Sequence, residues 1–224
     1  MNGASRGHGN LDEWTDDSSG GRRFIPAESG SGKIACPPRS RAVSSAYIFS
    51  WYEIAHLSML YLYCTHKLLK RLKPDMVEAG TSTTKLGNWY ATVLPWRPQV
   101  AMLVNEQTLL PVLMPLAPAA TLTARFPAAL AQILAPHGVP RSFIDSEVSE
   151  MQVVKYTKTQ NRSVVGIMTE FARLAEAYRA HDKPTELIDL SLKLACTPCS
   201  PLYKGPVSPE RALKALTNDG GAAS

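Results

Sequence analysis

The sequence predicts an α+β domain in which an antiparallel sheet of about four to five strands carries helices packed mainly on one face. Three observations support this fold class. Short β-type segments follow one another closely between residues 88 and 116, an amphipathic helical pattern runs from Ser163 to Tyr178, and apolar patterning begins abruptly at Met59. We therefore expect one globular domain over residues 59–216 and a flexible tail over residues 217–224.

The segment 1–58 lacks the pattern of a fold. Half of the 14 glycines lie before residue 33, and the apolar residues follow neither helical nor strand periodicity. Such a stretch cannot offset the roughly 1–2 kcal/mol per residue that ordering a backbone costs. We interpret it as a disordered tail or as upstream codons included by a wrongly chosen start, and we favour the second. A chain that begins at Met59 is then expected to keep the thermal midpoint of the full chain.

Neither a membrane segment nor a phosphate-binding loop is predicted before Met59. The apolar stretch Ala46–Ser58 would place Glu53 near the centre of a span, where an acidic side chain costs roughly 2.5–3.5 kcal/mol. It also starts too late in the chain for a cleavable signal peptide. Gly30-Ser31-Gly32-Lys33 lacks the earlier glycine and the following Ser or Thr of a phosphate loop.

Composition bounds the function classes only loosely. The first 58 residues carry six basic and six acidic side chains, so the net charge of +5 belongs to the remaining 166 residues (224 − 58). This excess is milder than the basic, aromatic-rich stripe of a dedicated nucleic-acid binder. The four cysteines, at positions 36, 64, 196 and 199, do not form a disulfide framework for a chain of this size. We expect a cytoplasmic protein.

The strands are predicted from alternation and from their spacing. They are expected at Leu60–Cys64, Asn88–Trp96, Val100–Val104, Thr108–Leu116 and Gln152–Thr157. The three central segments are separated by turns of a few residues, which permit only antiparallel pairing. Pro111 and Pro115 cannot donate hydrogen bonds to a neighbouring strand, so their strand is expected at an edge or with a bulge. Residues 76–86 are polar and predict a loop.

The helices are predicted from 3.6-residue periodicity and from capping residues. They are expected at His66–Leu72, Thr123–Ala135, Ser163–Tyr178, Thr185–Ala195 and from Ser208-Pro209 to about Leu216. Thr65 is a candidate N-cap of the first helix. Pro127 is expected in the first turn of the second helix, where its missing N–H does little harm. Ile144–Met151 is ambiguous between helix and loop.

The first helix is amphipathic and basic. Its leucines share one face, and the other face carries His66, Lys67, Lys70 and Arg71. Such a face is either an ordinary solvated surface or a contact for phosphates or an acidic partner. Both interpretations remain open.

A second polar cluster, Lys158, Asn161, Arg162 and Ser163, lies where a strand leads into the long helix. Unpaired N–H groups at a helix start, beside two cations, favour anion binding. Alternatively, Asn161 or Ser163 caps the helix and the cations are solvated. If the protein has a small-molecule site, we expect it at this corner.

Other tempting motifs have plainer explanations. Cys196-Thr197-Pro198-Cys199 follows a helix C-terminus, whereas a redox pair needs the N-terminal pole, and a zinc site needs further ligands. Trp89, Tyr90 and Trp96 are either core residues or a stacking platform. Glu147 and Glu150 lie in an ordinary polar stretch, and no Ser-His-Asp order, GxSxG or HExxH motif occurs.

Four short motifs, in this order and spacing, resemble landmarks of a bacterial family known only as a domain of unknown function. They are Cys64-Thr65-His66-Lys67-Leu68-Leu69, Trp89-Tyr90-Ala91, Val104-Asn105-Glu106-Gln107-Thr108 and Asn161-Arg162-Ser163-Val164-Val165-Gly166. The resemblance covers roughly residues 59–216. The chain departs from it at His66, where members usually have Lys, and at Met168, where they have a smaller residue. The resemblance implies boundaries but no activity.

These observations predict a cytoplasmic binding or regulatory module rather than an enzyme, with nucleic acid or an acidic protein as the expected partner. We expect no cofactor, no metal ion and no membrane contact. One alternative is a small enzyme acting on a phosphorylated or anionic substrate at the corner between Lys158 and Arg162. Another is a component of a toxin–antitoxin or mobile-element system.

Overall fold

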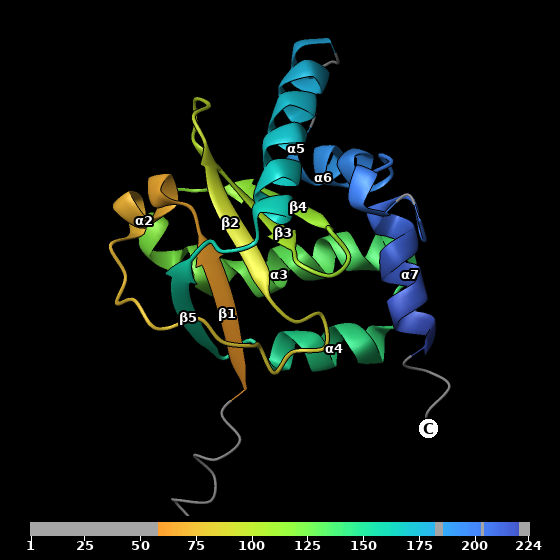
Figure 1. Cartoon of the computed structure of the whole chain (residues 1–224), viewed down its shortest axis with the longest axis horizontal. Helices are drawn as coiled ribbons and strands as arrows, with labels where there is room; N and C mark the ends of the chain where they lie inside the picture. The colour runs from red at the N-terminus through yellow and green to blue at the C-terminus, as the bar shows by residue number, and fades with distance from the viewer. Residues whose placement is uncertain (1–57, 182–185, 203, 220–224) are drawn as a thin grey trace, which may run out of the picture. The chain divides into compact units, whose positions relative to one another are not determined.

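The computed structural model describes residues 58–181, 186–202 and 204–219 (Figure 1). All of them belong to the second of the two units into which the chain divides, Ser45–Ser224. The predictions made for the N-terminal segment, and the expected helix start at Thr185, lie outside the described residues.

Over the described residues, strands and helices follow the predicted order closely. The strands are β1 (Met59–Cys64), β2 (Trp89–Leu94), β3 (Val100–Asn105), β4 (Pro111–Pro115) and β5 (Val153–Lys158). The helices are α2 (His66–Leu72), α3 (Leu122–Leu134), α4 (Arg141–Ser149), α5 (Arg162–His181), α6 (Leu187–Ala195) and α7 (Pro209–Asp219). Short 3-10 turns lie at η2 (Ala119–Thr121), η3 (Ala135–His137) and η4 (Ser200–Leu202). α7 continues into the segment predicted as a tail.

The strands form one mixed sheet in the order β4-β3-β2-β1-β5. β2, β3 and β4 are antiparallel neighbours, as predicted from their short turns. β1, in contrast, runs parallel to both β2 and β5, so the prediction of an antiparallel sheet is wrong for this half. The reason is connection length. The link from β1 to β2 contains α2, and the link from β4 to β5 contains α3 and α4, which allows a parallel return.

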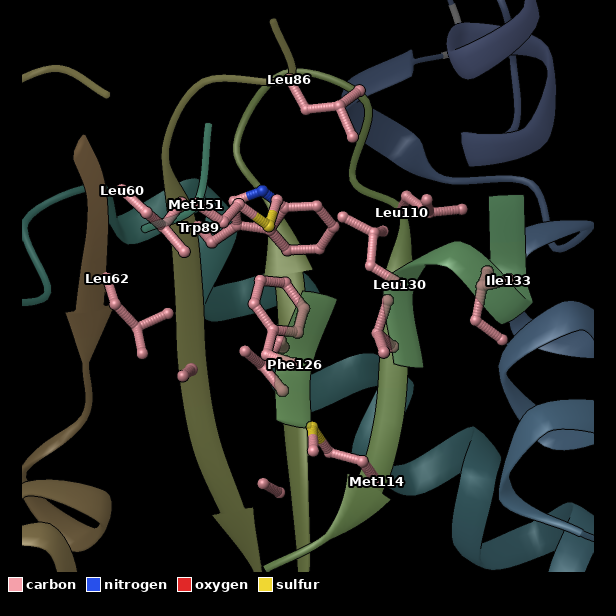
Figure 2. Packing of buried hydrophobic residues seen from close by; sticks show 14 of the residues in the cluster. Leu60, Leu62, Leu86, Trp89, Leu110, Met114, Phe126, Leu130, Ile133 and Met151 are labelled. Carbon is pink, nitrogen blue, oxygen red and sulfur yellow. The ribbon is translucent and has the colours of Figure 1, made fainter. Parts of the chain in front are cut away.

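Helices cover both faces of the sheet. Along β2, Trp89 and Ala91 face a core that includes α3 and α4, whereas Tyr90 and Leu94 face a second core beneath α5. Figure 2 shows the first of these cores, and in Figure 1 α3 passes behind the strands. All six positions of β3 are buried. The prediction of helices mainly on one face is therefore wrong, because an apolar stripe shows that a helix packs but not on which side.

The strand β4 lies at an edge of the sheet, as its prolines predicted. In its pairing with β3, the backbone polar groups of Pro111, Leu113 and Pro115 point outward, away from β3. The two prolines have no N–H to offer. The Leu113 N–H donates to the hydroxyl of Ser191 on α6, at 2.8 Å. The outward donors of this edge are thus absent or satisfied.

The helices α3 and α4 also differ from their predictions in detail. α3 begins at Leu122, so Pro127 lies inside the helix and not in its first turn. The ambiguous segment Ile144–Met151 is helical as far as Ser149, and α4 begins at Arg141 directly after Pro140. A proline directly before a helix does not disrupt the turns that follow, so Pro140 is compatible with the helix start.

Candidate functional site

The carboxyl ends of β1 and β5 lie side by side and bring the two predicted basic clusters to the same end of the sheet. Cys64 at the end of β1 is paired in register with Lys158 at the end of β5. After β1 the chain turns into α2, whose Leu68 joins the α3 core, and after β5 it turns into α5 on the opposite face. Where neighbouring parallel strands lead to opposite faces, α/β proteins commonly bind ligands.

α2 has the bounds predicted from the sequence, and its amphipathic pattern explains them. Leu68 is fully buried, while Leu69 and Leu72 pack at the margin of the same core. Thr65 stands at the N-cap position, but its hydroxyl pairs with that of Thr92 on β2 at 2.9 Å instead of capping the helix. The helix ends at Leu72 and is followed by the C-cap residue Lys73, whose backbone is left-handed with a φ of 48°. The four basic side chains His66, Lys67, Lys70 and Arg71 reach the surface, and none of them is buried.

Three of these side chains line a cleft of about 470 Å³ beside the end of β2. The lining consists of Lys67, Lys70, Arg71, Val93, Pro95 and Gln99. It contains no carboxylate. Within the part of the chain that the structure describes, the three cations form no ion pair. His66 lies outside the lining. The cleft therefore has uncompensated positive charge on one side, and its remaining lining is the aliphatic pair Val93 and Pro95 and the amide of Gln99.

At the second predicted cluster, Asn161 caps α5. Its Oδ1 accepts hydrogen bonds from the N–H groups of Ser163, at 3.0 Å, and Val164, at 3.4 Å. This confirms the capping interpretation, and it occupies two donors that a bound anion would use. Lys158, Arg162 and Ser163 are exposed. Ligand contact at this corner remains a prediction.

The sequence did not predict the carboxylate beside this corner. Glu106, directly after β3, accepts from Asn88 Nδ2 at 3.0 Å, from the Tyr90 hydroxyl at 3.2 Å and from Asn161 Nδ2 at 3.3 Å. The Asn161 N–H also donates to the Tyr90 hydroxyl, at 3.3 Å. We call these four residues the Glu106 network. Three of them, Tyr90, Glu106 and Asn161, come from separate motifs of the family resemblance, which is the one signal in the sequence that could have drawn attention to them.

Tyr90 keeps its proton within this network. Burial raises its pKa to about 12, and the negative charge of Glu106 acts in the same direction, whereas the hydrogen bond from the Asn161 backbone lowers it. The ring stacks on Tyr63 with a centroid distance of 4.8 Å. Burial also raises the pKa of Tyr63, whose hydroxyl donates to the Gly80 carbonyl at 2.8 Å. Both phenols serve as neutral hydrogen-bond donors.

The aromatic residues on β2 belong to the core. Trp89 is 0% exposed, Tyr90 1% and the adjacent Trp96 8%. Trp89 meets Phe126 edge to face, with ring centroids 5.0 Å apart. The core interpretation is confirmed, and these rings do not form an exposed stacking platform.

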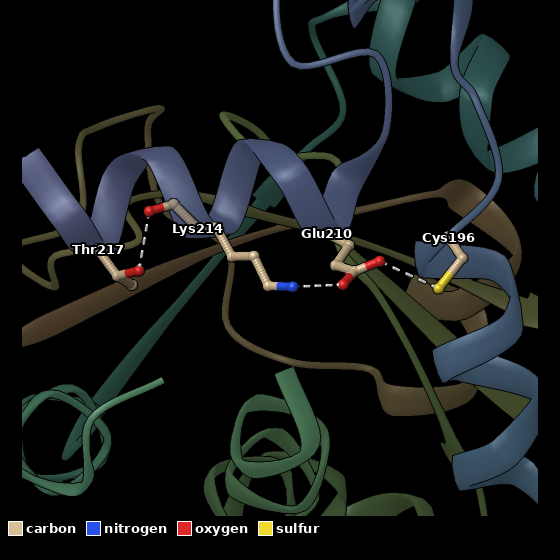
Figure 3. A network of polar contacts seen from close by, with 4 residues as sticks. All are labelled: Cys196, Glu210, Lys214 and Thr217. Carbon is tan, nitrogen blue, oxygen red and sulfur yellow. Dashed lines mark hydrogen bonds and ion pairs between the residues drawn. The ribbon is translucent and has the colours of Figure 1, made fainter. Parts of the chain in front are cut away.

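The Cys196–Cys199 motif follows the C-terminal end of α6, as predicted. The Cys196 thiol donates to Glu210 at 3.2 Å, and Lys214 donates to the other oxygen of that carboxylate at 2.6 Å (Figure 3). Burial raises the pKa of Cys196, and it raises that of Cys199 to about 11. Protonated thiols are poor nucleophiles and metal ligands. Among the described residues, no group of three His, Cys, Asp or Glu side chains is arranged to hold a metal ion.

Glu147 is not part of an ordinary polar stretch, contrary to the prediction. It is fully buried on α4, and one of its oxygens accepts from the Leu86 N–H at 3.2 Å. Burial raises its pKa to about 7, against the lowering effect of that hydrogen bond. The residues around Glu147 in the sequence are mostly polar, so the sequence gave no indication that its side chain is buried.

Comparison with known sequences identifies a family. The sequence model of DUF6933, described as a domain of unknown function, matches residues 61–212, which confirms the resemblance inferred from the four motifs. Neither the search of curated proteins nor that of solved structures finds a match. Among the described residues, no helix has the length and apolarity needed to cross a membrane.

Proposed function

The chain belongs to the DUF6933 family, whose description assigns no activity, and we propose from its geometry that it is a cytoplasmic binding module for nucleic acid. The basic face of α2 makes the contact. Lys67, Lys70 and Arg71 meet phosphate groups at the cleft beside β2, and Lys158 and Arg162 add positive charge at the same end of the sheet.

The cleft carries this proposal. Its three cations project from one face of a single helix, since positions 67, 70 and 71 are related by i, i+3 and i+4 spacing. Cations without local carboxylates attract phosphates and release the counterions condensed on a nucleic acid. The aliphatic wall formed by Val93 and Pro95 keeps part of the surrounding dielectric low, which strengthens these attractions.

The enzymatic alternative has weaker support. An enzyme at the corner would need an acid or base free to exchange a proton with its substrate. Glu106 already accepts three hydrogen bonds there, and the proton of Tyr90 is held firmly. This alternative, like a role in a toxin–antitoxin or mobile-element system, remains a prediction.

Fluorescence anisotropy with labelled DNA and RNA, measured on the full chain at low salt, tests the proposal. Replacing Lys67, Lys70 and Arg71 by Ala is expected to weaken binding roughly tenfold or more. It should also lower the slope of log affinity against log salt by about one for each phosphate that is no longer neutralised. A charge-matched control replaces three basic residues on other surfaces: Arg173, Lys204 and Arg211. Equal losses in both variants, or no binding by the wild type, would overturn the proposal.

A further inference from the structure

We infer that the partner of the α2 face is duplex nucleic acid, bound through its phosphates with little dependence on base sequence. This inference rests on the proposed function and specifies its ligand. Two observations support it: the lining of the cleft is cationic and has no aromatic residue, and the aromatic residues Trp89, Tyr90 and Trp96 are buried.

Single-stranded nucleic acid is usually held by aromatic side chains that stack on the bases. The rings on β2 and directly after it that the sequence offered for this purpose are Trp89, Tyr90 and Trp96. The helices that cover the two faces leave them between 0% and 8% exposed. The lining of the basic cleft contains no aromatic residue. A single strand bound at the cleft would therefore place its phosphates against Lys67, Lys70 and Arg71 but would find no aromatic ring in the lining on which to stack its bases.

Base reading in a groove is also poorly supported. A recognition helix presents polar side chains to base edges from a surface that enters the major groove. α2 has seven residues, so it is only about 10 Å long, and one of its faces is held against the core by Leu68. The face that remains is dominated by Lys and Arg. Such side chains position a protein on the phosphate backbone without specifying sequence.

Charge density then favours the duplex. A duplex presents one negative charge for about every 1.7 Å of its axis, so about six phosphates fall within the length of α2. A single strand offers roughly half that density over the same distance. Lys67, Lys70 and Arg71 on one helical face, with Lys158 and Arg162 beyond the paired end of β1 and β5, can reach more phosphates on the denser ligand.

The test compares four probes of about 20 nucleotides or base pairs: duplex DNA, duplex RNA, and the corresponding single strands. Each is titrated with the full chain at one fixed low salt concentration, and an acidic peptide of equal charge serves as a fifth ligand. We expect the duplexes to bind roughly tenfold tighter than their single strands, with a change of less than about twofold when the base sequence is scrambled. The two duplex arms show whether DNA, RNA or both are accepted.

Equal or tighter binding of the single strands, or strong dependence on base sequence, would overturn the duplex inference and leave the proposed function standing. Tighter binding of the acidic peptide than of any nucleic acid would overturn both and indicate a protein partner. Weakened duplex binding on replacement of Lys67, Lys70 and Arg71 by Ala, with unchanged thermal melting, would support both.

Discussion

The α2 face and the Glu106 network are both polar, and both lie near the parallel half of the sheet, but they are built in opposite ways. On the α2 face, Lys67, Lys70 and Arg71 line an open cleft without a carboxylate. In the Glu106 network, every carboxylate oxygen already accepts a hydrogen bond from a neighbouring side chain. The difference indicates that the network stabilises the fold, whereas the α2 face is available to a ligand.

The strongest challenge to this comparison is Glu106→Ala. It leaves Asn88, Tyr90 and Asn161 without their shared acceptor, and a hydrogen bond to a charged group contributes a net of about 1.5–3 kcal/mol. We expect a loss of about 3 kcal/mol in the free energy of unfolding, measured by urea denaturation. The exposed neighbour Gln107 serves as a control. Its replacement, Gln107→Ala, should lower the free energy of unfolding by less than about 0.5 kcal/mol. Equal effects would show that the network does not stabilise the fold.

Glu147 sharpens the comparison because burial outweighs the hydrogen bonds that this carboxylate accepts, and its second oxygen has no hydrogen-bond partner among the residues that the structure describes. Its pKa is raised from 4.5 to about 7, so the folded state binds the proton more tightly than the unfolded state. The resulting stability is complete below about pH 4.5 and is lost as the pH rises through 7. Glu147→Gln should remove this dependence and gain about 2 kcal/mol on the wild type between pH 5 and pH 8. Parallel stability curves for the two proteins would contradict this expectation.

Asn161→Ala tests the capping side of the network. The change removes the acceptor for the first N–H groups of α5 and one donor to Glu106, so we expect a loss of about 1–2 kcal/mol. Thermal melting followed by circular dichroism measures it. Ser163→Ala, at an exposed position in the same motif, should melt within a few tenths of a kcal/mol of the wild type. A larger loss of stability for Ser163→Ala than for Asn161→Ala would show that Asn161 is not the residue that caps α5.

The smallest effect on stability is expected for the double change Lys158→Ala and Arg162→Ala. Both side chains are exposed, and exposed charges contribute within about 1 kcal/mol. Affinity for nucleic acid should nevertheless fall, by less than in the α2 variant, because Asn161 already occupies the helix donors at this corner. Anisotropy titrations at two salt concentrations measure the change. If affinity fell more in this variant than in the α2 variant, the corner around Lys158 and Arg162 would be the centre of the interface.

Local patterns predicted the elements, and distant contacts decided what they build. α2 and the long helix α5 were found because leucines and other apolar residues repeat within a few turns. The parallel pairing of β1 was missed because it depends on connections long enough to permit either direction. Glu106 and Asn161 are 55 residues apart, and Leu86 and Glu147 are 61 residues apart. Sequence periodicity carries no information about contacts between residues so far apart, so these buried and half-buried polar contacts were visible only in the structure.

The outer edge of β4 has a consequence for assembly. A sheet grows when a new strand exchanges hydrogen bonds with an edge in both directions. Along β4 the outward positions offer two prolines and one N–H that is already bound to Ser191. An incoming strand would find carbonyls to donate to but nothing to accept from, so the ladder could form only half its bonds. Pairing of two copies through β4 is thereby disfavoured, because the prolines remove half of the hydrogen bonds that a further strand would need.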